Sequence, residues 1–256
     1  MTPPQPETPL SSWEHVGVYD QIGNLLARLP ANFQSAINVK GIRATEIYAF
    51  SSVLGLTIEQ EVIRTLNELH SFWDVDDRYF GYRFTRQAQT FPDALLINPQ
   101  TRHIIMGLEL KSWYLLAKEG EPSFRYQVTP NACAIQDLLV IVPWVLSNVL
   151  SGSPIVFKPF IAPARYVAEY RNYWWQSLRK TLDHADILSP KNVTPYPRAR
   201  AKMSDKPVYD DGKNFGRIAR IGMLDEYVNS FDQVDLLGID IKSWRTFLKT
   251  KTNLAE

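Results

Sequence analysis

The sequence lacks the residues on which several protein classes depend. Cys133 is the only cysteine among 256 residues, so no disulfide framework can form within the chain, and its small and apolar neighbours indicate a buried structural side chain. The four histidines are scattered and do not show metal-ligand spacing. The sequence has no phosphate-cradling glycine loop, no dinucleotide fingerprint and no Gly-x-Ser-x-Gly elbow. We therefore expect neither a nucleotide cofactor nor serine-hydrolase chemistry.

Long apolar runs and an excess of charge of one sign are also missing. The longest apolar stretch, residues 138–150, is interrupted by Pro143 and Ser147, so it falls short of the roughly 18 residues of a membrane span. The net charge of +1 gives no global basic field, although a local basic cleft is compatible with it. The proline-rich start has no signal-peptide pattern. We expect a cytoplasmic protein with no membrane partner, a disordered tail over residues 1–11 and one domain over residues 12–256.

The most informative pattern is a hairpin with acidic residues at one end. The apolar run 94–98 leads into an Asn-Pro turn, and residues 103–108 form a second apolar run. A turn of four or five residues then places Asp93 opposite Leu108 or Glu109. The two carboxylates are therefore predicted to lie within reach of each other, on backbones roughly 4.5–5.5 Å apart.

Side-chain alternation along the second strand adds a lysine to this pair. Glu109 and Lys111 point to one face, whereas Leu110 points into the core. Close carboxylates repel each other, and a divalent cation such as Mg²⁺, which prefers oxygen ligands, removes that conflict. Such a metal activates water and stabilises charge on a phosphoryl oxygen. We expect the lysine to position or deprotonate the attacking water, with its pKa lowered by partial burial.

Pro92-Asp93 followed by Glu109-Leu110-Lys111 resembles the motif of the PD-(D/E)XK nuclease superfamily, which includes most type II restriction endonucleases. The resemblance implies that Asp93, Glu109 and the Leu110 carbonyl hold Mg²⁺, while Lys111 orients or activates the water. It also implies a prokaryotic enzyme with a restriction-endonuclease-like fold that cleaves double-stranded DNA at specific sites. Such enzymes usually act as homodimers, because two-fold symmetry lets one site cut each strand.

Three alternatives remain open at this point. The chain could be a DNA-binding module of the nuclease fold that does not cut, although its intact set of acids and lysine speaks against this. It could be a DNA repair or recombination nuclease of the same fold. It could also be an unrelated α/β protein in which the acids and the lysine form an ordinary surface network.

A fourth candidate, Glu59, comes from a predicted helix. Residues 43–54 are expected to form one helix, and Thr57 begins a capping box for a second helix over residues 58–70. Glu59 falls inside the apolar sector of that helix and Glu61 outside it. A glutamate turned toward the core needs a partner, and nucleases of the resembled superfamily often add a helix acid to the metal site. The alternative is a first-turn acid favoured by the helix dipole.

Candidate DNA contacts lie in two basic segments. The first contains Arg83, Arg86 and Gln87 and leads directly into the hairpin, although nearby aspartates could equally pair with its arginines. The second lies within residues 191–220, the most basic window, with eight lysines and arginines against three aspartates. A loop of this length is usually functional or disordered, and it is either a DNA contact or a solvated surface. Its candidates are Arg198, Arg200 and Lys202.

The remaining pattern predicts an α/β fold with a central mixed sheet flanked by helices. The other expected strands are residues 124–128, 137–145 and 155–161, with Pro143 marking a strand end or bulge; the other expected helices are residues 12–29, 162–182, 215–231 and 241–249. Asp240-Ile241-Lys242 repeats the pattern of Glu109-Leu110-Lys111, but its neighbours follow helical spacing. We therefore interpret Asp240 as a helix N-cap.

Overall fold

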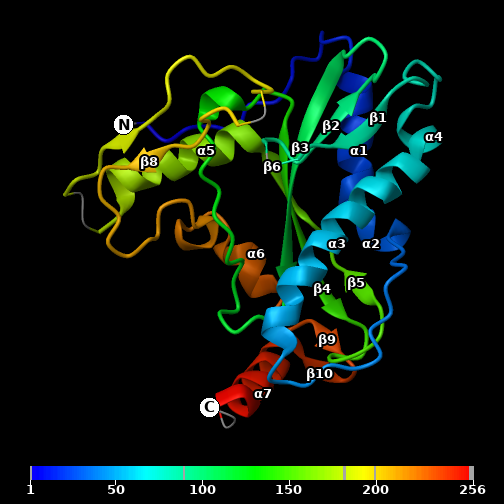
Figure 1. Ribbon diagram of the computed structural model, residues 1–256, viewed down its shortest axis with the longest axis vertical. Helices are drawn as coiled ribbons and strands as arrows, with labels where there is room; N and C mark the ends of the chain where they lie inside the picture. The colour runs from blue at the N-terminus through cyan, green and yellow to red at the C-terminus, as the bar shows by residue number, and fades with distance from the viewer. Residues whose placement is uncertain (1, 89, 181–182, 199, 254–256) are drawn as a thin grey trace.

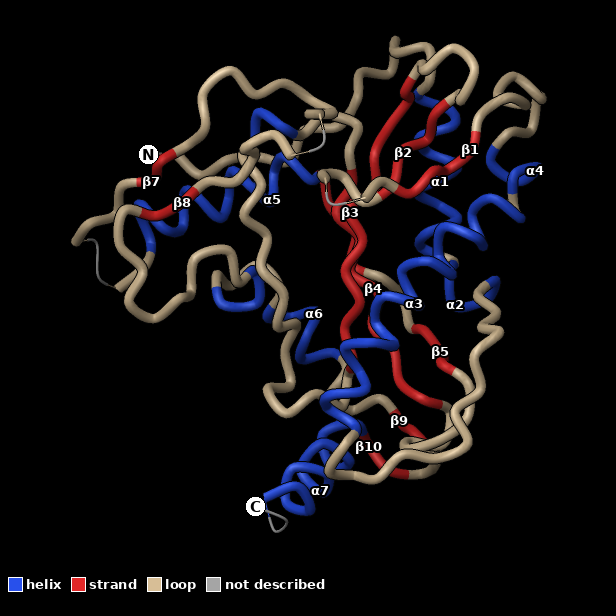
Figure 2. The backbone as a smooth tube through the Cα atoms, in the orientation of Figure 1, coloured by secondary structure: helices blue, strands red, loops and turns tan. Residues whose placement is uncertain are grey.

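Six strands form a mixed sheet in the computed structural model, which describes residues 2–88, 90–180, 183–198 and 200–253. The strand order is β1-β2-β3-β4-β5, and β6 also pairs with β4 (Figures 1 and 2). The mixed sheet between helices confirms the predicted α/β class. The strands are β1 Arg83–Arg86, β2 Ala94–Ile97, β3 Ile104–Tyr114, β4 Leu138–Leu146, β5 Pro154–Val156 and β6 Phe160–Pro163.

The predicted hairpin is present as β2 and β3. Ala94 lies opposite Leu108, and Ile97 lies opposite Ile104 after a one-residue irregularity. Continued by one residue, this register brings Asp93 opposite Glu109, which is one of the two partners expected from the turn length. β1 adds an antiparallel strand beside β2, and β4 runs parallel to β3 on the other side.

β4 is the central strand, and all nine of its residues are buried. Pro143 neither ends it nor bulges it, contrary to expectation. Instead, Pro143 lies where the antiparallel neighbour changes, because β6 pairs with residues 138–141 and β5 with residues 144–146. A residue without an N–H fits this gap between two partners. The predicted strand over residues 155–161 is accordingly divided between β5 and β6.

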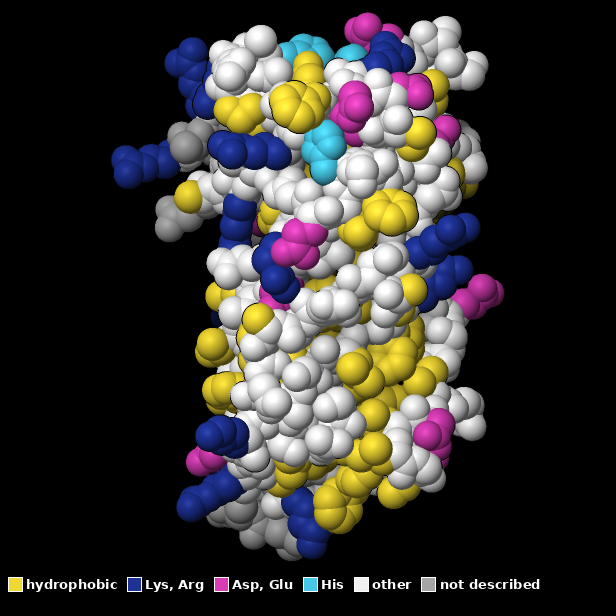
Figure 3. Space-filling view, turned by 90° about the vertical axis from the view of Figure 1, so that its right-hand side faces the viewer, with side chains coloured by type: hydrophobic (Ala, Val, Ile, Leu, Met, Phe, Trp, Pro, Cys, Tyr) yellow, Lys and Arg dark blue, Asp and Glu magenta, His cyan; other side chains and the backbone are white. Residues whose placement is uncertain are grey.

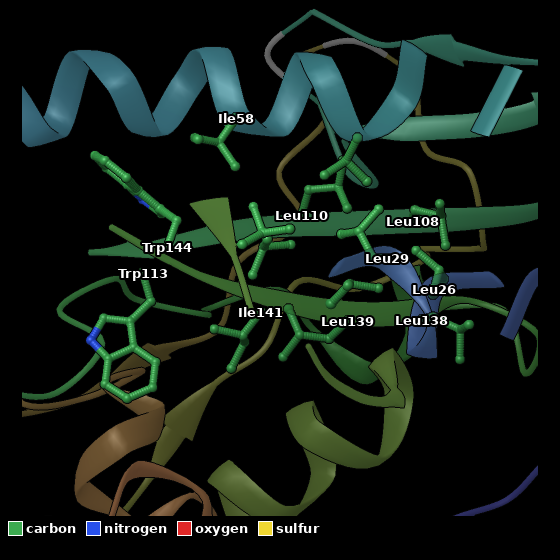
Figure 4. Close-up of a cluster of buried hydrophobic side chains, with 14 of the residues drawn as sticks. Leu26, Leu29, Ile58, Leu108, Leu110, Trp113, Leu138, Leu139, Ile141 and Trp144 are labelled. Atoms are coloured by element: carbon green, nitrogen blue, oxygen red, sulfur yellow. The ribbon is translucent and has the colours of Figure 1, made fainter. Parts of the chain in front are cut away.

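Helices cover both faces of the sheet (Figure 1). In Figure 4, Leu108 and Leu110 point toward α3 and Ile58, whereas Leu139 and Ile141 point to the opposite face, where α5 packs on β4. This division fixes the face of every β3 residue, because successive side chains alternate. The α-helices are α1 Val16–Ala27, α2 Leu29–Asn32, α3 Ile47–Glu68, α4 His70–Trp73, α5 Ala164–Tyr173, α6 Asp225–Ser230 and α7 Ile241–Asn253. Among the described residues, no helix is both long and apolar enough to cross a bilayer.

α3 corrects the prediction of two successive helices. It runs without a break, and the Thr57 hydroxyl donates to the Leu54 carbonyl instead of capping a new helix. The prediction that Glu61 faces outward was wrong as well. Glu61 is 8% exposed, and its carboxylate accepts a hydrogen bond from the Ala36 amide at 3.0 Å. The preceding segment covers this side of α3, which a helical wheel alone does not reveal.

Three further predicted elements differ from the structure. Residues 215–231 do not form one helix, because Gly216 and Gly222 adopt φ values of +84° and +81°. Only a 3₁₀ turn and α6 remain there. Residues 124–128 form isolated bridges instead of a strand. α5 ends at Tyr173 in a π-helical turn, and residues 181–182 of the predicted helix lie outside the described residues.

The shorter elements are β7 Ile187–Leu188, β8 Lys206–Pro207, β9 Asp235–Leu236, β10 Ile239–Asp240, the 3₁₀ turns Pro130–Ala132 and Ile218–Arg220, and the π-helical turn Trp174–Leu178.

Two smaller predictions are confirmed. Asp240 precedes α7, and its carboxylate accepts a hydrogen bond from the Ser243 amide at 2.8 Å, as an N-cap does. The second Asp-Ile-Lys run is therefore the start of a helix. Cys133 is fully buried, and burial raises the pKa of its thiol to about 12. It consequently remains protonated at neutral pH.

Replacing Gly107 with alanine is expected to destabilise the fold by about 1–3 kcal/mol, as overpacking does. The new Cβ would contact the Pro92 ring and lie 2.9 Å from Asp137 Oδ1. Chemical denaturation measures the change. Gly23→Ala is the matched control, because Gly23 lies within α1 with nothing within 4 Å of the added Cβ. The control is expected to be neutral or stabilising, and equal effects in both variants would contradict the packing described here.

Candidate active site

The candidate site lies where β2 begins and leaves one edge of β3 open. β2 pairs with β3 no further than Leu108, so the next outward amides need other acceptors. The Leu110 amide donates to Asp93 Oδ2 at 2.9 Å, and the Ser112 amide donates to Glu59 Oε1 at 3.1 Å. Two carboxylates thus take the place of the missing strand. These bonds fix both acids against β3.

Lys111 lies between the two acids of the predicted trio. Its Nζ is 2.7 Å from Glu109 Oε1 and 3.2 Å from Asp93 Oδ2. The side chains are 20% exposed for Lys111, 12% for Glu109 and 27% for Asp93. The structure therefore brings the three residues together on one face, where solvent still reaches them.

Burial and repulsion act on Glu109. Burial and the nearby Asp93 carboxylate raise the pKa of Glu109 to about 7, although Lys111 opposes the shift. Burial alone would lower the pKa of Lys111, but Glu109 and Asp93 outweigh it and hold this pKa above its ordinary value. The expectation of a lowered lysine pKa was therefore wrong. Lys111 is an ammonium at neutral pH, so it suits orienting a water or a phosphate better than removing a proton.

The oxygen atoms around Lys111 form a donor set of the kind that Mg²⁺ prefers. Asp93 and Glu109 supply carboxylates, and the Leu110 carbonyl faces the same open edge as its amide, because both groups of a strand residue point to one side. Within the described parts of the chain, no group of three His, Cys, Asp or Glu residues gathers as a metal cluster. Mg²⁺ commonly uses only one or two carboxylates and keeps several waters, so this set fits it.

Glu59 approaches the trio from α3. It lies in the middle of a long helix, which excludes the first-turn explanation of its position. Burial raises the pKa of Glu59, the charges of Lys111 and Arg86 oppose that shift, and Asp93 adds to it. The carboxylate is therefore within the electrostatic reach of the site, although it accepts its hydrogen bond from the Ser112 amide.

An arginine-lined groove of about 740 Å³ begins beside Asp93, because its lining includes Leu95, two residues along the chain, and Gln87, whose amide donates to the Asp93 carbonyl. Four of the predicted DNA contacts line it, and they come from two distant segments: Arg83, Arg86, Gln87 and Arg198. Arg102, from the hairpin turn, also lines the groove and was missed by the sequence analysis. The signal for Arg102 was the predicted hairpin, whose turn lies beside the first residue of β1, because Arg83 pairs with Ile97 at the end of β2. Arg200 and Lys202 are exposed but do not line the groove.

A partly buried hydrogen bond between Tyr196 and Asp137 holds the loop that carries Arg198 beside the sheet. The Tyr196 hydroxyl donates to Asp137 Oδ1 at 3.0 Å, and Asp137 also accepts from the Gly107 and Ala134 amides at 2.7 Å each. Asp137 is fully buried. Neither side chain of this pair was predicted from the sequence. An acid directly before a continuous apolar strand was the signal for Asp137.

Comparisons of the chain with protein-family models, with curated proteins and with solved structures found no match. The fold and the geometry of the site are therefore the basis of the functional argument.

Magnesium binding to the DNA-free protein is expected to weaken as the pH falls below about 7, approaching tenfold per pH unit. Glu109, whose pKa is raised to about 7, must lose its proton before it binds the cation. Isothermal titration calorimetry across this range measures the affinity. Asp93→Asn is expected to weaken binding at every pH. An affinity that stays constant between about pH 6 and pH 8 would exclude Glu109 as a ligand.

Proposed function

We propose that this protein is a Mg²⁺-dependent nuclease that hydrolyses phosphodiester bonds in double-stranded DNA, with a restriction-endonuclease-like fold. The proposal depends on one observation above all. Asp93, Glu109 and Lys111 lie together on one face at an open strand edge, next to a groove lined by arginines. Acids for a cation, an ammonium and a basic approach surface are the components that phosphodiester hydrolysis needs.

Each residue of the trio has a distinct task in this scheme. Asp93 and Glu109, with the Leu110 carbonyl, would hold Mg²⁺, which supplies a Lewis acid and a more acidic bound water. The hydrogen bond from the Leu110 amide keeps the Asp93 carboxylate in position. Lys111 remains charged and orients the attacking water or a phosphate oxygen. Glu59 lies close enough to assist a second ion.

The basic residues that would meet DNA are concentrated rather than spread over the molecule. On the face shown in Figure 3, Lys and Arg are intermixed with Asp and Glu, and hydrophobic side chains gather in its lower half. The groove, in contrast, has four arginines among its lining residues: Arg83, Arg86, Arg102 and Arg198. A local basic surface reconciles DNA binding with a net charge of +1. A two-fold symmetric homodimer would cut both strands of a duplex.

The decisive test is incubation of supercoiled plasmids of varied sequence with the purified protein, with and without Mg²⁺. Cleavage is expected only with the metal, and discrete products would indicate site-specific cutting. Lys111→Met is expected to lower the cleavage rate by about 10²–10³-fold, as loss of one group that stabilises transition-state charge does. Its binding of Mg²⁺ should be retained, because the carboxylates remain.

Lys242→Met is the matched control, since Lys242 belongs to the repeated Asp-Ile-Lys run but is 66% exposed on α7. It is expected to cut at the normal rate. An absence of Mg²⁺-dependent cutting by clean, folded protein across all the plasmids would overturn the nuclease proposal and favour a non-cleaving DNA-binding module.

A further inference from the structure

The floor of the groove is apolar, although its rim is basic. Alternate residues of β1 and β2 face it, so Thr85 lies opposite Leu95 and Arg83 lies opposite Ile97. Ile104 of β3 continues this floor beside Ile97. Among the described residues that line the groove there are four arginines and neither aspartate nor glutamate. The groove is thus complementary to a ligand that is apolar in one part and anionic in another.

A paired DNA backbone matches only the rim of such a groove. Phosphates and sugars of a duplex contact arginines but gain nothing from an aliphatic floor. An unpaired nucleotide matches both parts, because its base has an apolar face and its phosphates are anionic. The volume of about 740 Å³ falls within the range of cavities that enclose small organic groups.

Tyr196 and Pro197 form one wall of the groove. The Tyr196 hydroxyl is engaged by Asp137, which fixes the side chain without using its ring. The Thr90 hydroxyl donates to the Pro197 carbonyl at 3.4 Å and joins this wall to the segment before β2. A fixed aromatic side chain in the wall beside an aliphatic floor is a suitable surface for a base.

The floor continues directly into the candidate active site. Leu95 and Asp93 are two residues apart along the same face of the hairpin, or roughly 6.6 Å at the rise of an extended chain. Gln87 extends the pairing, because its amide donates to the Asp93 carbonyl at 2.7 Å. A base on Leu95 and Ile97 would therefore have a neighbouring phosphate beside Asp93.

We propose that this groove binds an unpaired nucleotide of the DNA substrate, with its base against Leu95, Ile97 and the Tyr196 ring. The flanking phosphates lie on the arginines of the rim. This inference depends on the proposed function and names the form of DNA that the site receives: a single-stranded, gapped or locally opened segment, with a phosphate next to it delivered to Asp93 and Glu109.

The test is fluorescence anisotropy with three labelled DNAs of matched length in EDTA, so that nothing is cut: a single strand, a duplex with a short central unpaired segment, and a fully paired duplex. The first two DNAs are expected to bind about tenfold more tightly than the paired duplex, which matches the binding free energy contributed by stacking one base. Equal affinity for all three DNAs would overturn the inference.

Two variants separate the floor from the rim. Ile97→Thr keeps a β-branched side chain and is expected to remove most of the preference for unpaired DNA. Arg102→Ala is expected to weaken binding of every DNA. It is also expected to reduce the slope of log binding constant against log salt concentration by about one, the loss of one phosphate contact. Arg43→Ala is the matched control, because Arg43 is exposed and does not line the groove. Normal thermal melting would show that each variant is folded, and a full preference in folded Ile97→Thr would overturn the inference.

The outcomes also distinguish this inference from the proposed function. Mg²⁺-dependent cutting of paired plasmid, with no preference for unpaired DNA in binding, would retain the nuclease and reject the groove as a nucleotide site. A preference for unpaired DNA that depends on Ile97, in a protein that never cuts, would support the groove and reject the nuclease.

Discussion

The position of the Lys111 ammonium between two carboxylates is the interaction on which the rest of the site depends. Without it, Asp93 and Glu109 would face each other as two partly buried negative charges, and one of them would be forced to remain protonated. The lysine makes the pair tolerable, while burial and, to a lesser extent, the Asp93 carboxylate still hold the pKa of Glu109 above its ordinary value. A site that retains this residual conflict favours a cation of higher charge.

The late start of β2, at Ala94, determines where this conflict is located. If the pairing of β2 with β3 continued back to Thr90, its backbone would take the two β3 amides that now donate to Asp93 and Glu59. The open edge therefore positions the acids, and side-chain alternation then places the groove on the same face, one row away. The same alternation leaves Leu108 and Leu110 to the core under α3 (Figure 4). The two faces of the hairpin thus have different tasks, because one carries the candidate active site and the other packs in the core.

Local pattern was sufficient to predict the centre of the fold but not its periphery. The apolar runs and the Asn-Pro turn limited the partner of Asp93 to Leu108 or Glu109, because register in a hairpin is set by turn length, and the structure selects Glu109. Burial of Glu61 and the interruptions at Gly216 and Gly222 depend on distant segments or on positive φ values that a helical period does not reveal. Arg102 joins Arg83 only through tertiary pairing. The rise in the pKa of Lys111 likewise required the actual distances to both acids.

Charge accounting links the metal to the groove. Asp93, ionised Glu109 and Lys111 together have one net negative charge, which would repel a phosphate brought to them. A bound Mg²⁺ would change that to one net positive charge and would release Lys111 from at least part of its ion pairing, because both compete for the same oxygen atoms. DNA in the arginine groove and Mg²⁺ at the acids would then favour each other's binding, and by linkage the effect is equal in both directions. In the proposed scheme the lysine would consequently have two roles, as a substitute cation before the metal binds and as a free ammonium afterwards.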